Sequence, residues 1–247
     1  MGHIKTRGLV IKAINFGESS KILTVLTHDF GKIKIVANNA RRGSGGKPGT
    51  QMFSYCDYSL FKGKKELYRL NDAHCIEQFT ALRGDLEKLS YAAYFAEIAA
   101  NVATENGGDE QLLSLLLNSI HLLCSGAVSP KKIKLVYELR GISLAGFMPD
   151  FSCCCDCSAE RGITSFDLIN GTIMCGNCIQ IVPYVAEIND NLRSACAYIT
   201  TAEINKIFYF EMSDELLEYL GNIAERYVAM QIDKELKSLE YLKKVLM

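Results

Sequence analysis

Four cysteines form two Cys-x-x-Cys pairs, Cys154 with Cys157 and Cys175 with Cys178. Zinc is commonly bound by thiolates, and two pairs at this spacing supply the four ligands of a tetrahedral shell. A shell closed by four protein ligands leaves no position for water or substrate, so the predicted chemistry is structural. We therefore predict a structural Zn²⁺ site made by Cys154, Cys157, Cys175 and Cys178.

Two further thiols, Cys153 and Cys155, adjoin the first pair. The two-residue spacing favours Cys154 as the partner of Cys157, although either neighbour could exchange into the shell. An iron–sulfur cluster also takes four thiolates and stays open as an alternative. A thioredoxin-like redox site is disfavoured because the surrounding sequence lacks a βαβ pattern.

The segment between the two pairs predicts a β-hairpin. Strand-like sequence at 164–169 and 172–175 flanks Asn170-Gly171, a dipeptide preferred in type I′ turns. Such a hairpin returns the second pair of cysteines toward the first, and so it positions the metal ligands.

Charge is divided unevenly along the chain. Residues 1–80 carry thirteen Lys and Arg against six Asp and Glu, whereas residues 81–247 carry fourteen against twenty-two. The fold itself does not require this division. A polyanion that contacts the first segment would explain it, because each neutralised phosphate releases condensed counterions.

Residues 1–80 show the pattern of a small antiparallel barrel. Short β-rich runs are separated by turn residues such as Gly17 and Gly63. Five strands in this length indicate an OB-fold or an SH3-like barrel. The predicted strands are 8–15, 21–27, 32–37, 52–61 and 66–73.

Lysines on the third of these strands and cations in the loop after it are the candidate phosphate contacts. Lys32 and Lys34 alternate with isoleucines, so the two-residue period of a strand places both lysines outside the barrel. The stretch 38–49 has four glycines, three cations and no apolar periodicity, which indicates a basic loop that can follow a phosphate backbone. The predicted contacts are Lys32, Lys34, Arg41, Arg42 and Lys47. Weaker candidates, for which solvation alone is the better explanation, are Lys12, Lys21, Lys62, Lys64, Lys65 and Arg69.

Aromatic residues are interleaved with these cations. OB-folds that hold single strands stack bases on exposed rings. A barrel of this size needs most of its rings in the core, so we expect few to be exposed. Tyr55 and Tyr68 are the first choices, because a hydroxyl group tolerates the surface.

From about residue 82 the apolar period changes from two to 3.6, which predicts helices. Ser129 before Pro130 and Ser213 before Asp214 are typical helix starts, and the run 200–203 matches a capping box. The predicted helices are 82–103, 110–124, 130–147, 200–210 and 214–242. We therefore predict an α+β fold, with a barrel domain at 1–80 and a helical domain at 81–247 that a zinc-ribbon-like insertion interrupts at about 150–185.

Motifs of common enzyme classes are missing from the sequence. The glycine-rich loop fails as a phosphate-binding P-loop, because Gly46-Lys47 is followed by Pro48 and Arg41 stands where the first glycine belongs. None of the four histidines lies in a metalloprotease or deaminase motif. We expect a protein that is not an enzyme. Without a long apolar run or a signal-peptide pattern, we also expect no membrane span and a cytoplasmic location.

Several segments resemble the RecO family of bacterial DNA repair proteins, in the order of that family. The N-terminal segments that carry the resemblance are Gly8-Leu9-Val10-Ile11, Phe16-Gly17-Glu18-Ser19-Ser20-Lys21-Ile22-Leu23-Thr24, His28-Asp29-Phe30-Gly31-Lys32 and Ala40-Arg41-Arg42. The later segments are Tyr94-Phe95-Ala96-Glu97, Tyr137-Glu138-Leu139-Arg140, Gly146-Phe147-Met148-Pro149 and the two cysteine pairs. The likeness is sparse after about Ile188. Ser158 departs from it, since a glycine commonly follows the second cysteine.

The resemblance implies an N-terminal OB-fold that binds single- and double-stranded DNA, a helical domain with a zinc module, and no catalytic activity. It also implies a recombination mediator associated with the nucleoid. Members of the family anneal complementary strands and help load the recombinase RecA onto DNA coated by single-strand-binding protein. The implied partners are RecR and the acidic C-terminal tail of the single-strand-binding protein.

A transcription regulator that binds DNA through the zinc ribbon is the alternative. Arg161 is the only cation between the two cysteine pairs. A DNA-contacting ribbon needs more positive charge than this, so we expect the ribbon to brace the helical domain or to meet a partner.

Overall fold

The chain folds into two compact units. The computed structural model describes residues 2–41, 47–63, 67–105, 107–178 and 183–247. One unit comprises residues 1–125 and 238–247, and the other comprises residues 126–237. The predicted domain boundary near residue 80 stays a prediction.

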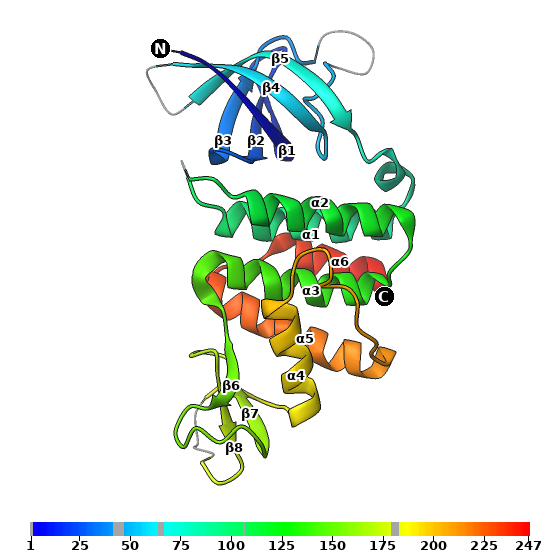
Figure 1. Cartoon of the computed structure of the whole chain (residues 1–247). Coiled ribbons are helices and arrows are strands. Elements are labelled where there is room, and N and C mark those ends of the chain that lie inside the picture. Colours follow the sequence, from blue (N-terminus) through cyan, green and yellow to red (C-terminus); the bar gives the residue numbers. More distant parts are fainter. Residues whose placement is uncertain (1, 42–46, 64–66, 106, 179–182) are drawn as a thin grey trace. The chain divides into compact units, whose positions relative to one another are not determined.

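The first unit contains a barrel and three α-helices (Figure 1). Its strands are β1 (Gly2–Phe16), β2 (Ser20–Thr27), β3 (Gly31–Ala37), β4 (Tyr55–Lys62) and β5 (Leu67–Glu77). A short 3-10 helix, η1 (Thr80–Gly84), precedes the α-helices α1 (Leu86–Val102), α2 (Glu110–Ser125) and α6 (Lys237–Leu246).

The five strands close into a barrel in the order β1-β2-β3-β5-β4. All neighbouring strands are antiparallel except β3 and β5, whose parallel pairing joins the ends of the sheet. Closure removes the free sheet edges, which otherwise invite aggregation. The predicted five-stranded, OB-like barrel and the α+β class are confirmed.

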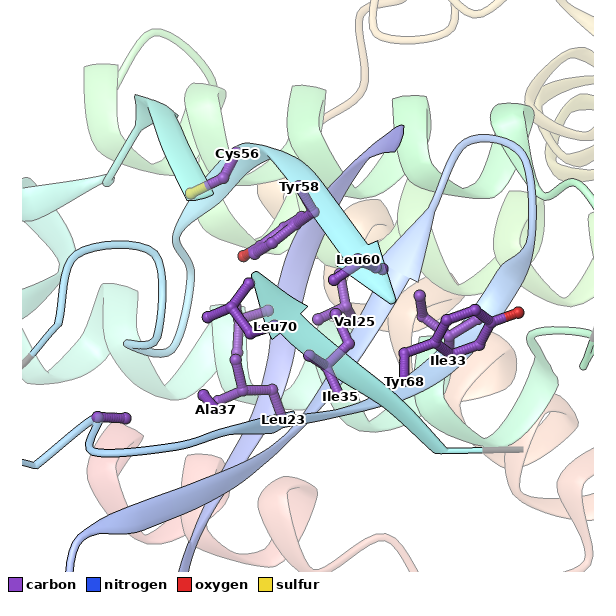
Figure 2. Close-up of a cluster of buried hydrophobic side chains, with 12 residues drawn as sticks. Leu23, Val25, Ile33, Ile35, Ala37, Cys56, Tyr58, Leu60, Tyr68 and Leu70 are labelled. Carbon is purple, nitrogen blue, oxygen red and sulfur yellow. The ribbon is translucent and has the colours of Figure 1, made fainter. Parts of the chain in front are cut away.

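Alternation along the strands fills the barrel interior. In β3, Ile33 and Ile35 are buried, whereas Lys32 and Lys34 lie outside, as the two-residue period predicts. Figure 2 shows side chains of the resulting cluster, most of them aliphatic, together with Tyr58 and Tyr68. The members of the cluster are Val10, Leu23, Val25, Ile33, Ile35, Ala37, Ala40, Cys56, Tyr58, Leu60, Tyr68 and Leu70.

Strand β1 is longer than the sequence predicts, because it serves two partners. Its first half pairs with β4 from Gly2 opposite Lys62, and its second half pairs with β2 as far as Phe16 opposite Ser20. An irregularity between Val10 and Lys12 lies at the change of partner. A bulge of this kind bends a strand and increases its twist, which lets one strand follow the curve of the barrel.

The turn between β2 and β3 is fastened to the segment that follows α1. The Lys32 amide donates a 2.9 Å hydrogen bond to the Thr104 carbonyl. Gly31 has a φ of 58°, and a Cβ there would lie 2.4 Å from the carbonyl oxygens of Thr104 and Gly107. This close approach therefore requires glycine at position 31.

The second unit combines a small sheet with helices. Its strands are β6 (Asp150–Cys154), β7 (Ile163–Asp167), β8 (Thr172–Cys175) and β9 (Val185–Glu187), in the order β6-β8-β7-β9. Its helices are α3 (Pro130–Ile142), the π-helical turn η2 (Ser143–Phe147), α4 (Asp190–Thr201) and α5 (Asp214–Ile232). The predicted caps are confirmed, since the Ser129 and Ser213 side chains accept hydrogen bonds from backbone amides of α3 and α5.

Two predicted helices are wrong. The run beginning at Thr200 ends helix α4, so the capping-box pattern there does not start a helix at 200–210. The predicted helix at 214–242 is two helices, because Asp233 adopts a left-handed conformation with φ 51° and ends α5. Helix α4 itself, capped by the Asn189 side chain, was not expected from the sequence.

The predicted hairpin between the cysteine pairs is confirmed, but the predicted type I′ turn is wrong. Asp167 pairs with Thr172, which leaves a loop of four residues rather than a two-residue turn. The Asp167 carboxylate accepts hydrogen bonds from the Ile169 and Asn170 amides. This side-chain capping replaces the type I′ geometry, and a positive φ occurs at Gly171 but not at Asn170.

Across the described ranges, no helix is long and apolar enough to cross a membrane.

Candidate nucleic-acid interface and metal centre

The outer wall of the barrel collects side chains from four strands. Opposite Thr24 of β2 lie Lys12 of β1 and Lys34 of β3, and Lys34 in turn pairs with Leu67 of β5. Because paired residues on adjacent strands point to the same side of a sheet, these side chains form one row across the wall.

A second row lies beside the first. Here Ile14 of β1, Ile22 of β2, Val36 of β3 and Arg69 of β5 are paired in succession. Phe16 continues the outward face of β1 beyond Ile14. We call the outer wall the set Lys12, Ile14, Phe16, Ile22, Thr24, Lys34, Val36, Leu67 and Arg69.

The cations of the outer wall form no ion pair with the residues that the structure describes. Lys12, Lys34 and Arg69 are all exposed, and no residue of the set is acidic. The nearest acidic residue along β1 is Glu18, in the turn to β2. Cations that are not neutralised by the protein's own carboxylates remain available to a polyanion.

The described ends of the basic loop are fixed at one end of the barrel. The Arg41 amide donates to the Ser19 carbonyl at 2.9 Å, and the Lys47 amide donates to the Ala40 carbonyl at 3.0 Å. The Lys21 ammonium donates to the Thr50 carbonyl at 3.3 Å. These contacts bring Lys21, Arg41 and Lys47 to the region of the β1–β2 turn, which adjoins the outer wall.

Lys32 has partners within the protein. Its ammonium group donates a 2.8 Å hydrogen bond to the Ala100 carbonyl and lies 3.8 Å from the Glu105 carboxylate. The side chain is only 18% exposed. The predicted phosphate contact at Lys32 stays a prediction, and these contacts give the side chain a structural role as well.

Of the other predicted cations, some lie within the described residues and some do not. Lys62 is exposed, and its ammonium lies 5.8 Å from the centre of the Tyr68 ring. Arg42, Lys64 and Lys65 lie outside the described residues.

The predicted base-stacking rings are not the exposed ones. Tyr68 is 3% exposed in the barrel core, so the prediction for this ring is wrong. Tyr55 is half-buried. Phe16 is 53% exposed, although it is not one of the two rings that the sequence reasoning chose first. Its place in the strand period after Lys12 and Ile14 is the signal that could have found it.

A cleft elsewhere on the barrel contrasts with the outer wall. It is lined by cations, histidines and carboxylates together, including Lys5, Arg7, His28, Asp57 and Asp72. Arg7 forms a 2.9 Å ion pair with Asp57, and the hydrogen bond from this pair raises the pKa of Arg7. Cations in this cleft are therefore balanced by acidic neighbours.

The four predicted metal ligands lie together in the second unit. The sulfur atoms of Cys154, Cys157, Cys175 and Cys178 are all within 4.8 Å of one another. Four sulfurs held tetrahedrally at about 2.3 Å from zinc are about 3.8 Å apart, so a small contraction of the cluster would fit the ion. The four cysteines could hold a metal ion.

The four cysteines of this cluster come from the ends of two strands and from the turns that follow them. Cys154 ends β6 and Cys175 ends β8, and each strand is followed by a turn that carries the second cysteine of the pair. The turns are closed by hydrogen bonds from Ser158 to the Cys154 carbonyl and from Cys178 to the Cys175 carbonyl. Ser158 has a φ of 59°, a conformation that favours glycine, so the serine backbone is strained at this turn.

Electrostatics at the cluster favour a thiolate. Backbone amides of Cys157, Cys175 and Asp156 lower the pKa of the Cys154 thiol to about 6. Hydrogen bonds with the Cys157 and Cys175 sulfurs raise the pKa of Cys178. The amide groups stabilise negative charge at Cys154, as a thiolate ligand requires.

The additional thiols lie at the edge of this cluster. Cys153 contacts the Ser152 hydroxyl at 3.7 Å, and Cys155 is exposed. Neither belongs to the group of four converging sulfurs in the described part of the chain. The predicted choice of Cys154 over its two neighbours agrees with this arrangement.

The barrel and the cysteine cluster together define a class: an α+β protein with an OB-like barrel, a helical region and a four-cysteine module. Models of two families match the chain in succession. "Recombination protein O N terminal" matches residues 1–79 and "Recombination protein O C terminal" matches residues 83–240. The chain belongs to the RecO family.

Relatives support this membership over nearly their full length. The "DNA repair protein RecO" of Acetivibrio thermocellus is 34% identical over 245 residues, which cover 98% of this chain and 97% of the relative. The protein of the same name from Caldicellulosiruptor bescii is 31% identical, with 97% and 98% covered. That of Alkaliphilus metalliredigens is 30% identical, with 98% and 99% covered.

Proposed function

We propose that this protein is a non-enzymatic, DNA-binding recombination mediator. It anneals complementary strands and helps load a recombinase onto DNA coated by single-strand-binding protein. Membership of the RecO family, whose curated relatives carry the name DNA repair protein, supports a role in DNA repair and recombination.

The observation that carries the proposal is the outer wall. Lys12, Lys34 and Arg69 are exposed and have no carboxylate partner in the described part of the chain, and Arg41 and Lys47 lie at the adjoining barrel end. A polyanion bound there gains free energy from counterion release without displacing internal ion pairs. Arg42, on the same loop, completes the proposed set, together with Lys32 as a cation that also has internal partners.

Annealing follows from the same surface chemistry. Two complementary strands repel each other through their phosphates, and this repulsion is reduced where cations neutralise part of the charge. A surface that binds backbones without reading base edges holds any sequence. It therefore suits a protein that must act on every complementary pair of strands.

The proposed partners are DNA in single- and double-stranded form, RecR, and the acidic C-terminal tail of single-strand-binding protein. The proposed place of action is the cytoplasm, at the nucleoid. A structural Zn²⁺ held by Cys154, Cys157, Cys175 and Cys178 would join the two strand-end turns into one rigid module.

A regulator that binds DNA through the cysteine module is not favoured. The chain belongs to a recombination family, and the segment between the cysteine pairs carries Arg161 as its single cation. Sequence-specific duplex binding without annealing would be the signature of such a regulator.

An annealing assay tests the proposal. Complementary strands coated with single-strand-binding protein are mixed with the full chain, and annealing is followed while the salt concentration is raised. We expect annealing that weakens with salt. The double variant Arg41→Ala/Arg42→Ala should bind DNA more weakly and lower the salt slope by about two, one for each lost phosphate contact.

Arg7→Gln is the matched control, because Arg7 lies on the same barrel but is paired with Asp57. It should leave the salt slope nearly unchanged. If the double variant has the affinity and salt slope of the wild type, the loop is not part of the DNA site. If the wild type neither binds nor anneals DNA, the proposed function is wrong.

A further inference from the structure

Apolar side chains occupy the outer wall between the cations. Phe16 and Ile14 are 53% and 47% exposed, although both belong to a strand whose inward side chains fill the core. Exposed apolar groups forgo the free energy of burial. The wall is therefore suited to a ligand that offers apolar surface as well as negative charge.

One cation and two apolar side chains line the outward face at the end of β1. Lys12, Ile14 and Phe16 follow each other at two-residue steps on one face, and each step covers about 6.6 Å. Across the sheet, Lys34 lies one row away from Val36. A ligand that lies along this face meets cationic and apolar groups in turn.

A cation also lies near the end of β1 that carries Phe16. Phe16 is followed by Gly17, whose carbonyl oxygen is 3.5 Å from a guanidinium nitrogen of Arg41. The Arg41 amide is bonded to Ser19 in the same turn. A phosphate held by Arg41 would therefore lie close to the turn that follows Phe16.

The chemistry of this row distinguishes two forms of DNA. In a duplex the base faces are stacked and hidden, so only phosphates and groove edges meet a protein surface. In a single strand the base faces are available, and an aromatic ring can stack on any of them. Exposed apolar groups between phosphate-binding cations thus favour the single strand.

We infer that Phe16 stacks on a base of single-stranded DNA, with Ile14 extending the apolar contact, and that this row sets a preference for single strands over duplexes. The inference rests on the proposed DNA-binding function and assigns its specificity. Lys12, Lys34 and Arg41 contribute affinity for both forms of DNA, whereas Phe16 contributes affinity for the single strand alone.

Fluorescence offers a direct test, since the sequence contains no tryptophan. In the variant Phe16→Trp the indole at position 16 is the only tryptophan. We expect a single-stranded oligonucleotide to quench its emission by stacking, and a saturating duplex of the same length to leave it nearly unchanged. Tyr209→Trp, at a side chain that is 78% exposed in the second unit, is the control and should respond to neither.

Affinity provides a second, independent readout. Phe16→Ala should weaken single-strand binding about tenfold, the ratio that about 1.4 kcal/mol of lost stacking gives, and leave duplex binding unchanged. The salt slope should also stay unchanged, because stacking releases no counterions. A strand of equal length that lacks its bases should bind the wild type and Phe16→Ala alike. Because the ring is exposed, we expect the variant to fold, which its melting temperature checks.

Each result decides the inference. It is overturned if the emission of Phe16→Trp fails to respond while single strands are bound, if Phe16→Ala weakens duplex binding equally, or if the base-free strand also distinguishes the variant from the wild type. Any of these would leave DNA binding itself intact. If the wild type binds neither form of DNA, the proposed function has failed instead.

Discussion

The outer wall of the barrel and the four-cysteine module gather their functional groups in different ways. The cysteines come from 25 residues of chain, and their sulfurs converge within 4.8 Å. The wall draws Lys12, Lys34 and Arg69 from three strands and presents them separately. A converging site fails when one ligand is lost, whereas a dispersed surface weakens in steps. The two regions should therefore respond differently to single substitutions.

The largest effect is expected at the converging site. Cys154→Ala should abolish zinc binding and destabilise the second unit by several kcal/mol, since metal binding and folding are coupled in such modules. Cys153→Ala should keep its zinc, because this thiol lies outside the cluster. Bound metal measured by atomic emission, together with thermal melting, checks both. Equal loss in the two variants would contradict the ligand assignment, and iron with visible absorbance would identify a cluster instead.

A smaller, graded effect is expected on the wall. Lys34→Ala/Arg69→Ala should weaken binding to single and double strands alike, about tenfold at low salt, and lower the salt slope by about two. Either single variant should show about half of this change in free energy. Titrations at several salt concentrations give the slopes. A double variant that binds like Arg7→Gln would show that the wall is not the contact surface.

Lys32 lies on the same strand as Lys34, but its ammonium group donates a hydrogen bond to the Ala100 carbonyl. Comparing the two lysines therefore separates a structural role from a phosphate contact. Lys32→Met should lower the free energy of unfolding by about 1 kcal/mol through the lost charge-assisted hydrogen bond. If structure is its main role, the salt slope of DNA binding should stay close to that of the wild type. Urea unfolding and DNA titration of this variant separate the two roles. A lowered slope with unchanged stability would place Lys32 among the phosphate contacts.

The smallest effect concerns pH. The hydrogen bond with Asp29 raises the pKa of His28 above its ordinary 6.5, burial partly opposes this rise, and Glu110 adds a smaller upward contribution. A raised pKa in the folded state means that the stabilisation is fully present below pH 6.5 and is lost as pH rises through the folded value. Because the histidine is exposed, we expect only a slight decrease in the urea midpoint between pH 6 and pH 8.

His28→Gln removes this titration and should flatten the pH dependence in that window. An unchanged difference between pH 6 and pH 8 would show that another group is responsible.

The sequence predicted the regions in which local pattern and local packing agree. Ile33 and Ile35 alternate with lysines and enter the core as expected, and Ser129 and Ser213 cap the helices they precede. Predictions from the sequence were wrong where the surrounding structure outweighs the local residue pattern. Thr200 and Thr201 end a helix because the chain before them is already helical, and Asp233 interrupts an apolar period that continues on both sides.

By itself the sequence determined the four-cysteine cluster, because a two-residue spacing within each pair and a hairpin between the pairs bring the four thiols together through local folding. It also determined which side chains of each strand point outward, since the strand period depends on the backbone alone. Only the tertiary structure decided which strands are neighbours. The pairing of β1, β2, β3 and β5 aligned Lys12, Lys34 and Arg69, buried Tyr68, left Phe16 exposed and turned Lys32 toward Ala100. Such contacts join residues far apart in the chain, and no local spacing encodes them.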